Sequence, residues 1–151
     1  MEVSQLPRID EHSVGVDADP DAVWLALSAR LDGIAGAPAG AYARLIGSPD
    51  HAASGPRPLA EGSVLPGFRV VSATRGEELT LRGHHRFSVY ALRFRIEREG
   101  VGRCRLTAES RATFPGVGGA IYRFLVIGTR GHGFAVRRLL AGVASRAELA
   151  G

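Results

Sequence analysis

The order of its segments predicts that this chain has an α+β fold, in which a curved antiparallel sheet of about six to seven strands wraps around a long C-terminal helix. An alternating segment over 8–17 leads into a helical pattern over 19–31. Strand-like segments then follow one another over 63–114, and an amphipathic helical segment occupies 117–148. A sheet curved around a helix leaves space between the two layers, so this order also predicts a cavity that holds a bound molecule.

The first two elements have clear local signals. Ile9, Val14 and Val16 alternate only partly, which indicates a strand with one partly buried face. Asp19 stands where a helix cap is expected and Pro20 occupies the first helical position. The predicted helix buries one apolar face, and Trp24 on that face is expected either in the core or at one end of the cavity. This face consists of Val23, Trp24, Leu27 and Leu31.

The region between the helix and the strands is rich in Ala, Gly and Pro. Residues 41–46 fit either a short helix or a short strand. Residues 48–58 indicate an exposed loop. Because a loop of this length within a small domain is often functional or mobile, it is a candidate gate to the cavity.

The strands that follow alternate with a period of two, which is typical of a sheet with one buried face and one solvated face. Most arginines fall on the solvated face, where Glu97 and Glu109 are expected as their cross-strand partners. Four sets of residues are each predicted to share a face: Phe68, Val70, Ser72 and Thr74; Leu79, Leu81, Gly83, His85 and Phe87; Tyr90, Leu92, Phe94 and Ile96; and Cys104, Leu106, Ala108, Ser110, Ala112 and Phe114.

The final segment carries apolar residues at helical spacing but is interrupted by glycines over 128–133. A kink above the cavity explains this interruption better than a phosphate-binding loop, because such loops join a strand to the start of a helix. Arg130 and His132 are expected at the edge of the cavity, where they can meet an anionic group. The apolar face comprises Ile121, Phe124, Leu125, Val136, Leu139, Leu140 and Val143.

Composition limits the classes of function. The 151 residues fit one domain, and the net charge of +4 comes from arginines spread along the chain, so no nucleic-acid partner is expected. The chain has no run of apolar residues long enough for stable membrane insertion, and its N-terminal residues lack the apolar core of a signal peptide. One cysteine, Cys104, excludes an internal disulfide and favours a cytoplasmic protein.

Three stretches resemble the START-like superfamily, also called SRPBCC or polyketide cyclase/dehydrase-like proteins. They are VDADPDAVWLAL, GHHRFSVYALRFRIE and RLTAESRATFPGVGGAIYRFLVIGTRGH, and the resemblance covers 14–140. The last two are similar to a bacterial subgroup without an agreed function. The resemblance implies a helix-grip fold of seven strands over an apolar cavity, with the seventh strand within 41–62. It also implies binding of lipids, steroids, hormones or polyketides, or cyclase and dehydratase activity.

Polar residues on otherwise apolar faces are the candidate functional groups. His85, Tyr90 and Ser110 can each hydrogen-bond a carbonyl or hydroxyl group of a ligand. His85 and Tyr90 together can also act as acid and base, although a lone His or Tyr on such a face also occurs as a satisfied core residue. The predicted ligand-binding residues are Trp24, Phe68, His85, Tyr90, Leu92, Phe94, Ser110 and His132.

Metal and cofactor chemistry have little support. His84 and His85 point to opposite faces of a strand and cannot easily share one ion, so neither a metal nor a cofactor is expected. Cys104 has no neighbouring His and acid in a recognisable pattern, and a buried structural role is predicted.

The sequence therefore predicts a protein that binds a small hydrophobic molecule, lipid-like, aromatic or polyketide-like. The alternative is a cyclase or dehydratase that uses His85 and Tyr90. A third reading is a partner-binding or chaperone-assisting module. No pattern in the chain specifies the ligand, a reaction or an oligomeric state.

Overall fold

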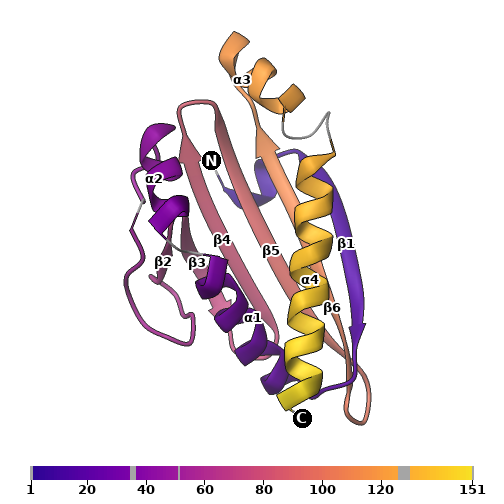
Figure 1. Ribbon diagram of the computed structural model, residues 1–151. Coiled ribbons are helices and arrows are strands. Elements are labelled where there is room, and N and C mark those ends of the chain that lie inside the picture. Colours follow the sequence, from indigo (N-terminus) through magenta and orange to yellow (C-terminus); the bar gives the residue numbers. More distant parts are fainter. Residues whose placement is uncertain (1, 35–36, 51, 126–129, 151) are drawn as a thin grey trace.

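Six antiparallel strands form one sheet in the order β1-β6-β5-β4-β3-β2 (Figure 1). This arrangement comes from a computed structural model that describes residues 2–34, 37–50, 52–125 and 130–150. The N-terminal strand thus pairs with the last one. The strands are β1 (Arg8–Val16), β2 (Val64–Leu65), β3 (Phe68–Thr74), β4 (Glu78–His85), β5 (Ser88–Gly100) and β6 (Arg103–Thr113).

Helices cover one face of this sheet, which we call the inner face. Of these, α1 and α4 lie side by side across it and contact each other (Figure 1). The predicted α+β class, an antiparallel sheet against a long C-terminal helix, is confirmed. The helices are the 3₁₀ helix η1 (Val3–Gln5), α1 (Pro20–Ile34), α2 (Ala37–Leu45), α3 (Gly116–Arg123) and α4 (Gly131–Ala150). No helix among the described residues is long and apolar enough to span a lipid bilayer.

The strand register brings the predicted apolar faces together. Leu79 lies opposite Phe94, and Phe94 lies opposite Ala108, so three strands contribute to one buried row. Each fully buried Leu or Phe side chain stabilises the fold by about 1.5–3 kcal/mol. From the other side, α1 and α4 contribute Leu27, Leu140 and other apolar residues to the same core.

A β-bulge changes the predicted faces of β3. The alternation predicts that Val70 and Ser72 share a face, but the register shifts between them. Because a bulge adds one residue to one strand, the side chains beyond it change face. Val70 and Ala73 therefore pack on the core, while Ser72 is exposed.

The prediction of one kinked helix over 117–148 is wrong, because the segment forms two separate helices. α3 ends at Arg123 and α4 begins at Gly131, directly after Arg130, whose φ of 63° is left-handed. The start of the predicted interruption, Gly128 and Thr129, lies outside the described residues. Ile121, Phe124 and Leu125 are exposed rather than buried with the α4 residues. Apolar spacing alone does not distinguish one long helix from two helices at an angle.

The segment before the strands is partly helical. Residues 41–45, which fitted either a helix or a strand, belong to α2. Among its described residues, 41–62 supplies no seventh strand to the sheet, only an isolated bridge from Ser54 to Val64. The loop over 48–58 is largely exposed, although Ser48 is buried.

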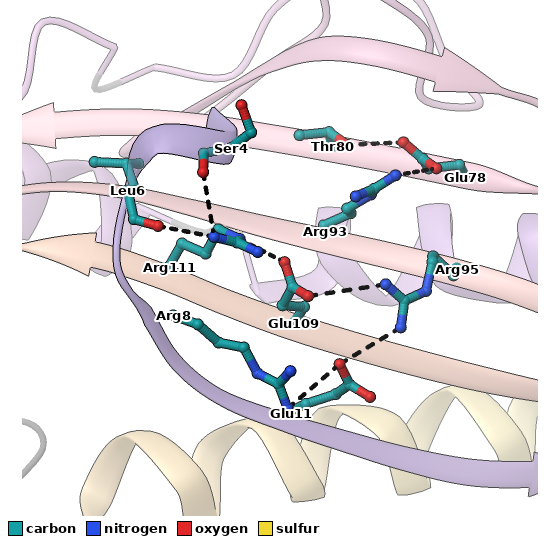
Figure 2. A network of polar contacts seen from close by, with 10 residues as sticks. All are labelled: Ser4, Leu6, Arg8, Glu11, Glu78, Thr80, Arg93, Arg95, Glu109 and Arg111. Carbon is teal, nitrogen blue, oxygen red and sulfur yellow. Dashed lines mark hydrogen bonds and ion pairs between the residues drawn. The ribbon is translucent and has the colours of Figure 1, made fainter. Parts of the chain in front are cut away.

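The outer face of the sheet carries a network of arginines and carboxylates around Glu109 (Figure 2). Arg111 donates a hydrogen bond of 2.6 Å from Nε to Glu109 Oε1, and Arg95 Nη1 lies 3.8 Å from Glu109 Oε2. Arg111 also donates to the carbonyl oxygens of Ser4 and Leu6, which attaches the N-terminal segment to the sheet. Glu109 thus lies between two cations, with only 5% of its surface exposed.

Candidate ligand-binding cavity

A cavity of about 420 Å³ lies between the inner face of the sheet and helices α1, α2, α3 and α4. This volume falls within the range of about 300–1,000 Å³ that is typical of small-molecule sites. Most of the wall is apolar or aromatic. Its apolar residues include Leu31, Ile34, Ala43, Ile46, Leu65, Phe68, Leu92, Ala112, Phe114, Val136 and Leu139.

Six of the predicted site residues line this cavity, and two do not. Trp24 and Phe94 lie in the packed core, apart from the cavity wall. The binding role of every one of these residues stays a prediction. The six that line the cavity are Phe68, His85, Tyr90, Leu92, Ser110 and His132.

His85 is surrounded by aromatic rings at one end of the cavity. Its ring centroid lies 4.8 Å from that of Tyr122 and 5.3 Å from that of Tyr90. Phe87 follows in the turn after β4 and stacks on Tyr122 at 5.7 Å, while Phe68 meets Tyr90 edge to face at 5.0 Å. Such contacts fix the orientation of the imidazole and make this end of the cavity a surface on which a planar ligand can stack.

The hydrogen bond that His85 accepts determines its tautomer. The Phe87 N–H donates to Nδ1 of His85 at 3.1 Å, so the proton of the neutral ring belongs on Nε2. Burial, together with the neighbouring charge of His84, lowers the pKa of His85 below its usual 6.5. At neutral pH, His85 is therefore uncharged, and its Nε2–H can donate a hydrogen bond. Its Nδ1 is occupied by the Phe87 N–H and is not free to accept a proton.

We expect a nuclear magnetic resonance titration to show His85 as the Nε2–H tautomer with a pKa below 6.5. A lowered pKa means that the unfolded chain binds more protons, so His85 reduces stability as the pH falls from 6.5 to its folded-state value. In a His85→Gln variant this part of the acid sensitivity should be lost. A His85 pKa at or above 6.5 would contradict the assignment.

Tyr90 is held by a backbone contact. Its hydroxyl donates a hydrogen bond to the carbonyl oxygen of Gly67. Burial raises the pKa of Tyr90 to about 12, although a hydrogen bond with Ser48 works in the opposite direction. Tyr90 is consequently protonated throughout the physiological range, and its hydroxyl proton is already engaged.

Tyr42 of α2 and Tyr122 of α3 meet beside this aromatic end. Their hydroxyl oxygens lie 3.4 Å apart, and both side chains line the cavity. Burial and the contact with Tyr42 raise the pKa of Tyr122. Because Tyr42 is exposed, the pair marks a place where the cavity wall meets solvent.

A second polar cluster, which we call the Ser110 cluster, brings together Asp10, His12, Ser110 and His132. His132 Nε2 lies 2.9 Å from Ser110 Oγ and 3.6 Å from Asp10 Oδ1. His12 Nε2 lies 3.3 Å from Asp10 Oδ2. Asp10 Oδ1 is buried without a hydrogen-bond partner among the described residues. The nearby carboxylate favours a proton on His132 Nε2, so Ser110 accepts from His132 and can donate its own proton.

Sequence reasoning missed Asp10 and His12. They share the inner face of β1 with Val14 and Val16, and the register places Asp10 opposite Ser110. Their spacing of two residues from these valines could have placed them on the inner face. Polar residues at the start of a weakly alternating strand, however, also fit a strand end that is exposed to solvent. Ser110 and His132 were predicted separately, and the fold brings them into contact.

The two polar clusters occupy different parts of the wall. Ser110 lies in one row with Leu92 and Leu81, and His85 stands four residues further along β4. At 3.3 Å per residue, the clusters are separated by roughly 13 Å along the strand direction. The geometry can therefore offer hydrogen bonds to both ends of an extended ligand whose middle is apolar.

The other candidate sites in the described part of the chain are less suited to binding a ligand. A more open depression lies at the opposite end, where four of its charged side chains already pair: Arg75 with Asp21 at 2.8 Å and Arg98 with Asp19 at 3.6 Å. No group of three His, Cys, Asp or Glu among the described residues is placed to hold a metal ion. Cys104 is buried in the core, and burial raises its pKa, as suits a structural thiol.

Comparisons with known proteins show which solved structures have a similar fold. No protein-family model and no curated protein sequence matches the chain. Similar solved structures include the ZhuI aromatase/cyclase from Streptomyces sp. R1128, with a TM-score of 0.59, 14% identity, and coverage of 95% of this chain and 94% of that one. A norcoclaurine synthase from Thalictrum flavum has a TM-score of 0.57 and 11% identity, covering 95% and 97% of the two chains.

A third similar structure is protein CV1439 from Chromobacterium violaceum, with a TM-score of 0.55, 12% identity, and coverage of 93% of this chain and 99% of that one. All three likenesses extend over nearly the full length of both chains, at identities that show the fold alone. The chain therefore shares the helix-grip fold of these structures, as its sequence resemblance implied, with six strands rather than seven among the described residues.

Proposed function

We propose that the protein binds a small hydrophobic molecule, aromatic or lipid-like, in the cavity between the sheet and helices α1, α2, α3 and α4. The observation that carries this proposal is the cavity of about 420 Å³ with its apolar and aromatic wall. Transfer of apolar ligand surface into such a wall is favourable, and a few placed polar groups fix orientation.

The polar groups suggest features of the ligand. His85 offers its Nε2–H at the aromatic end, and Ser110 offers its hydroxyl in the other cluster. Both act as donors, so they suit carbonyl, phenolic or ether oxygens on the ligand. A planar ring against Tyr90 and Tyr122, with an oxygen toward His85, uses the stacking surface and this donor together.

Titration with the fluorescent apolar probe 1-anilinonaphthalene-8-sulfonate tests the proposal. Ala112 lines the cavity opposite Tyr90, so an Ala112→Phe variant fills part of the space. We expect it to weaken probe binding by ~10-fold or more, the equivalent of losing about 1.4 kcal/mol of binding free energy.

The matched control is Val71→Phe, which adds a ring at an exposed position of β3 outside the cavity wall. The control should bind the probe as the wild type does. Equal binding by the wild type and Ala112→Phe, with only the bare mass of fresh protein in native mass spectrometry, would count against the proposal.

A second candidate function is a cyclase or dehydratase. It is favoured by the placement of His85 and Tyr90 side by side in one cavity, and by the likeness in fold to an aromatase/cyclase. Acid/base catalysis would require two hydrogen bonds to break: the one that His85 accepts from the Phe87 N–H and the one that Tyr90 donates to the Gly67 carbonyl oxygen. Conversion of a linear poly-β-ketone by the wild type, with a rate loss of roughly 100-fold in His85→Gln, would favour this function over simple binding.

A further inference from the structure

The apolar side of α3 faces solvent. Val117, Ile121 and Phe124, at positions i, i+4 and i+7, have exposed fractions of 80%, 58% and 69%. The opposite side of the helix packs inward through glycine: a Cβ on Gly119 would lie 2.5 Å from the carbonyl carbon of Phe114. A surface helix normally buries its apolar stripe and exposes its polar one. In α3 the apolar stripe is exposed, and the side that packs inward is glycine.

Neighbouring elements add to this surface. Tyr42 and Leu45 of α2 are exposed, and so is Phe134 in the first turn of α4. The helices α2 and α3 and the start of α4 all lie at the same end of the sheet (Figure 1). We call the exposed set the apolar end: Tyr42, Leu45, Val117, Ile121, Phe124 and Phe134. Large exposed apolar sets of this kind mark binding surfaces for proteins or membranes.

The charge around the apolar end is mostly positive. Three of the spans that supply this end, 33–49, 79–96 and 110–147, contain no Asp or Glu, and the acidic residues nearby, Asp10 and Glu11 at the start of β1, already face His132 and Arg8. Four exposed arginines accompany the apolar residues: Arg44, Arg86, Arg123 and Arg130. Within the described part of the chain, none of these four has an ion-pair partner, although Arg123 lies over the Phe114 ring at 5.6 Å.

The opposite end of the molecule is different. There, Arg75 pairs with Asp21 and Arg103 with Asp17, each at 2.8 Å. The one large apolar side chain in the turn between β5 and β6 is Val101, which is fully exposed. The opposite end also exposes Leu149 and Arg146, so the apolar end is distinguished by its larger set of exposed apolar side chains beside unpaired arginines.

We propose that the apolar end docks on the surface of an anionic lipid bilayer. Val117, Ile121 and Phe124 enter the headgroup region, and the arginines meet lipid phosphates through their planar guanidinium groups. Nucleic acid would pair with the arginines but would leave the aliphatic side chains without a partner. Because Tyr42 and Tyr122 belong to the cavity wall at this same end, a docked protein turns its cavity toward the bilayer. The inference does not depend on whether the cavity holds a ligand.

Flotation with lipid vesicles tests the inference on the full chain. We expect the protein to float with vesicles of phosphatidylcholine and phosphatidylglycerol, to bind pure phosphatidylcholine weakly, and to dissociate as the salt concentration rises. Ile121→Glu and Phe124→Glu should each abolish most of the binding. Both positions are exposed, so circular dichroism should show unchanged folding.

Val101→Glu is the matched control, because it places the same charge at an exposed apolar position on the opposite end. It should bind vesicles like the wild type. The inference is overturned if the wild type stays unbound at low salt, or if Val101→Glu and Phe124→Glu lose binding equally. It is also overturned if light scattering shows a dimer that Phe124→Glu dissociates while vesicle binding is absent, since the apolar end would then join two copies.

Discussion

Replacing Gly83 with alanine is expected to lower the free energy of unfolding by about 3 kcal/mol. Gly83 lies on the inner face of β4 opposite Tyr90. A Cβ at this position would lie 2.6 and 2.8 Å from two ring carbons of Tyr90, and still closer to the carbonyl oxygen of Gly67. These are the two groups that form the Tyr90–Gly67 hydrogen bond. The extra methyl group must therefore displace either the ring or the loop.

Urea unfolding followed by circular dichroism measures this effect. Gly33→Ala is the matched control, because a Cβ on Gly33 meets nothing within 4 Å and the residue lies in α1. That variant should be more stable than the wild type by up to about 1 kcal/mol, since alanine favours a helix over glycine. Equal midpoints for Gly83→Ala and the wild type would show that Tyr90 does not occupy the space next to Gly83.

Removing the charge of Glu109 is the second large expected effect. Glu109→Gln should lower the free energy of unfolding by about 3 kcal/mol, because the variant leaves Arg111 and Arg95 without their shared carboxylate. Burial alone would raise the pKa of Glu109, but the guanidinium groups of Arg111, Arg95 and Arg93 outweigh it and hold the pKa below the usual 4.5. The folded state thus favours the charged form.

The pH dependence of this effect has a definite sign. A lowered carboxylate pKa contributes stability that is complete above pH 4.5 and is lost as the pH falls through the folded-state value. The difference between the wild type and Glu109→Gln should therefore be largest near neutrality and shrink in acid.

The control for this prediction is Glu99→Gln, which breaks an exposed pair with Arg105. Removing an exposed pair should change stability by less than about 1 kcal/mol. Similar losses for both variants would mean that Glu109 is better solvated than its position between β1 and β5 indicates.

Alternation predicts the inner faces of β4, β5 and β6 correctly because these strands pair without interruption along their predicted faces. It fails in β3, where the bulge after Val70 depends on the pairing with β4 and leaves no trace in residue types. His85, Tyr90 and Ser110 could be found as cavity residues because each interrupts an apolar row.

Other features depend on contacts that no local pattern contains. Ile121 and Phe124 have the same spacing as the buried residues of α4, so only the position of α3 against Phe87 and Phe114 determines that they face outward. Asp10 and His132 are distant in sequence, and the pairing of β1 with β6 brings them together. The sheet and helix layers of this fold can be predicted from the sequence, whereas the side-chain clusters between distant elements can be identified only from the structure.

The pairing of β1 with β6 also has a consequence for how the chain forms during protein synthesis. β1 leaves the ribosome well before β6, the one strand it pairs with among the described residues. At roughly 5–20 residues per second, β1 waits for several seconds with an unpaired backbone. The sheet cannot close, and the space above it cannot take shape, until β6 has been made. A nascent chain stalled before Arg103 should therefore be sensitive to protease along β1, whereas the released protein should resist cleavage there.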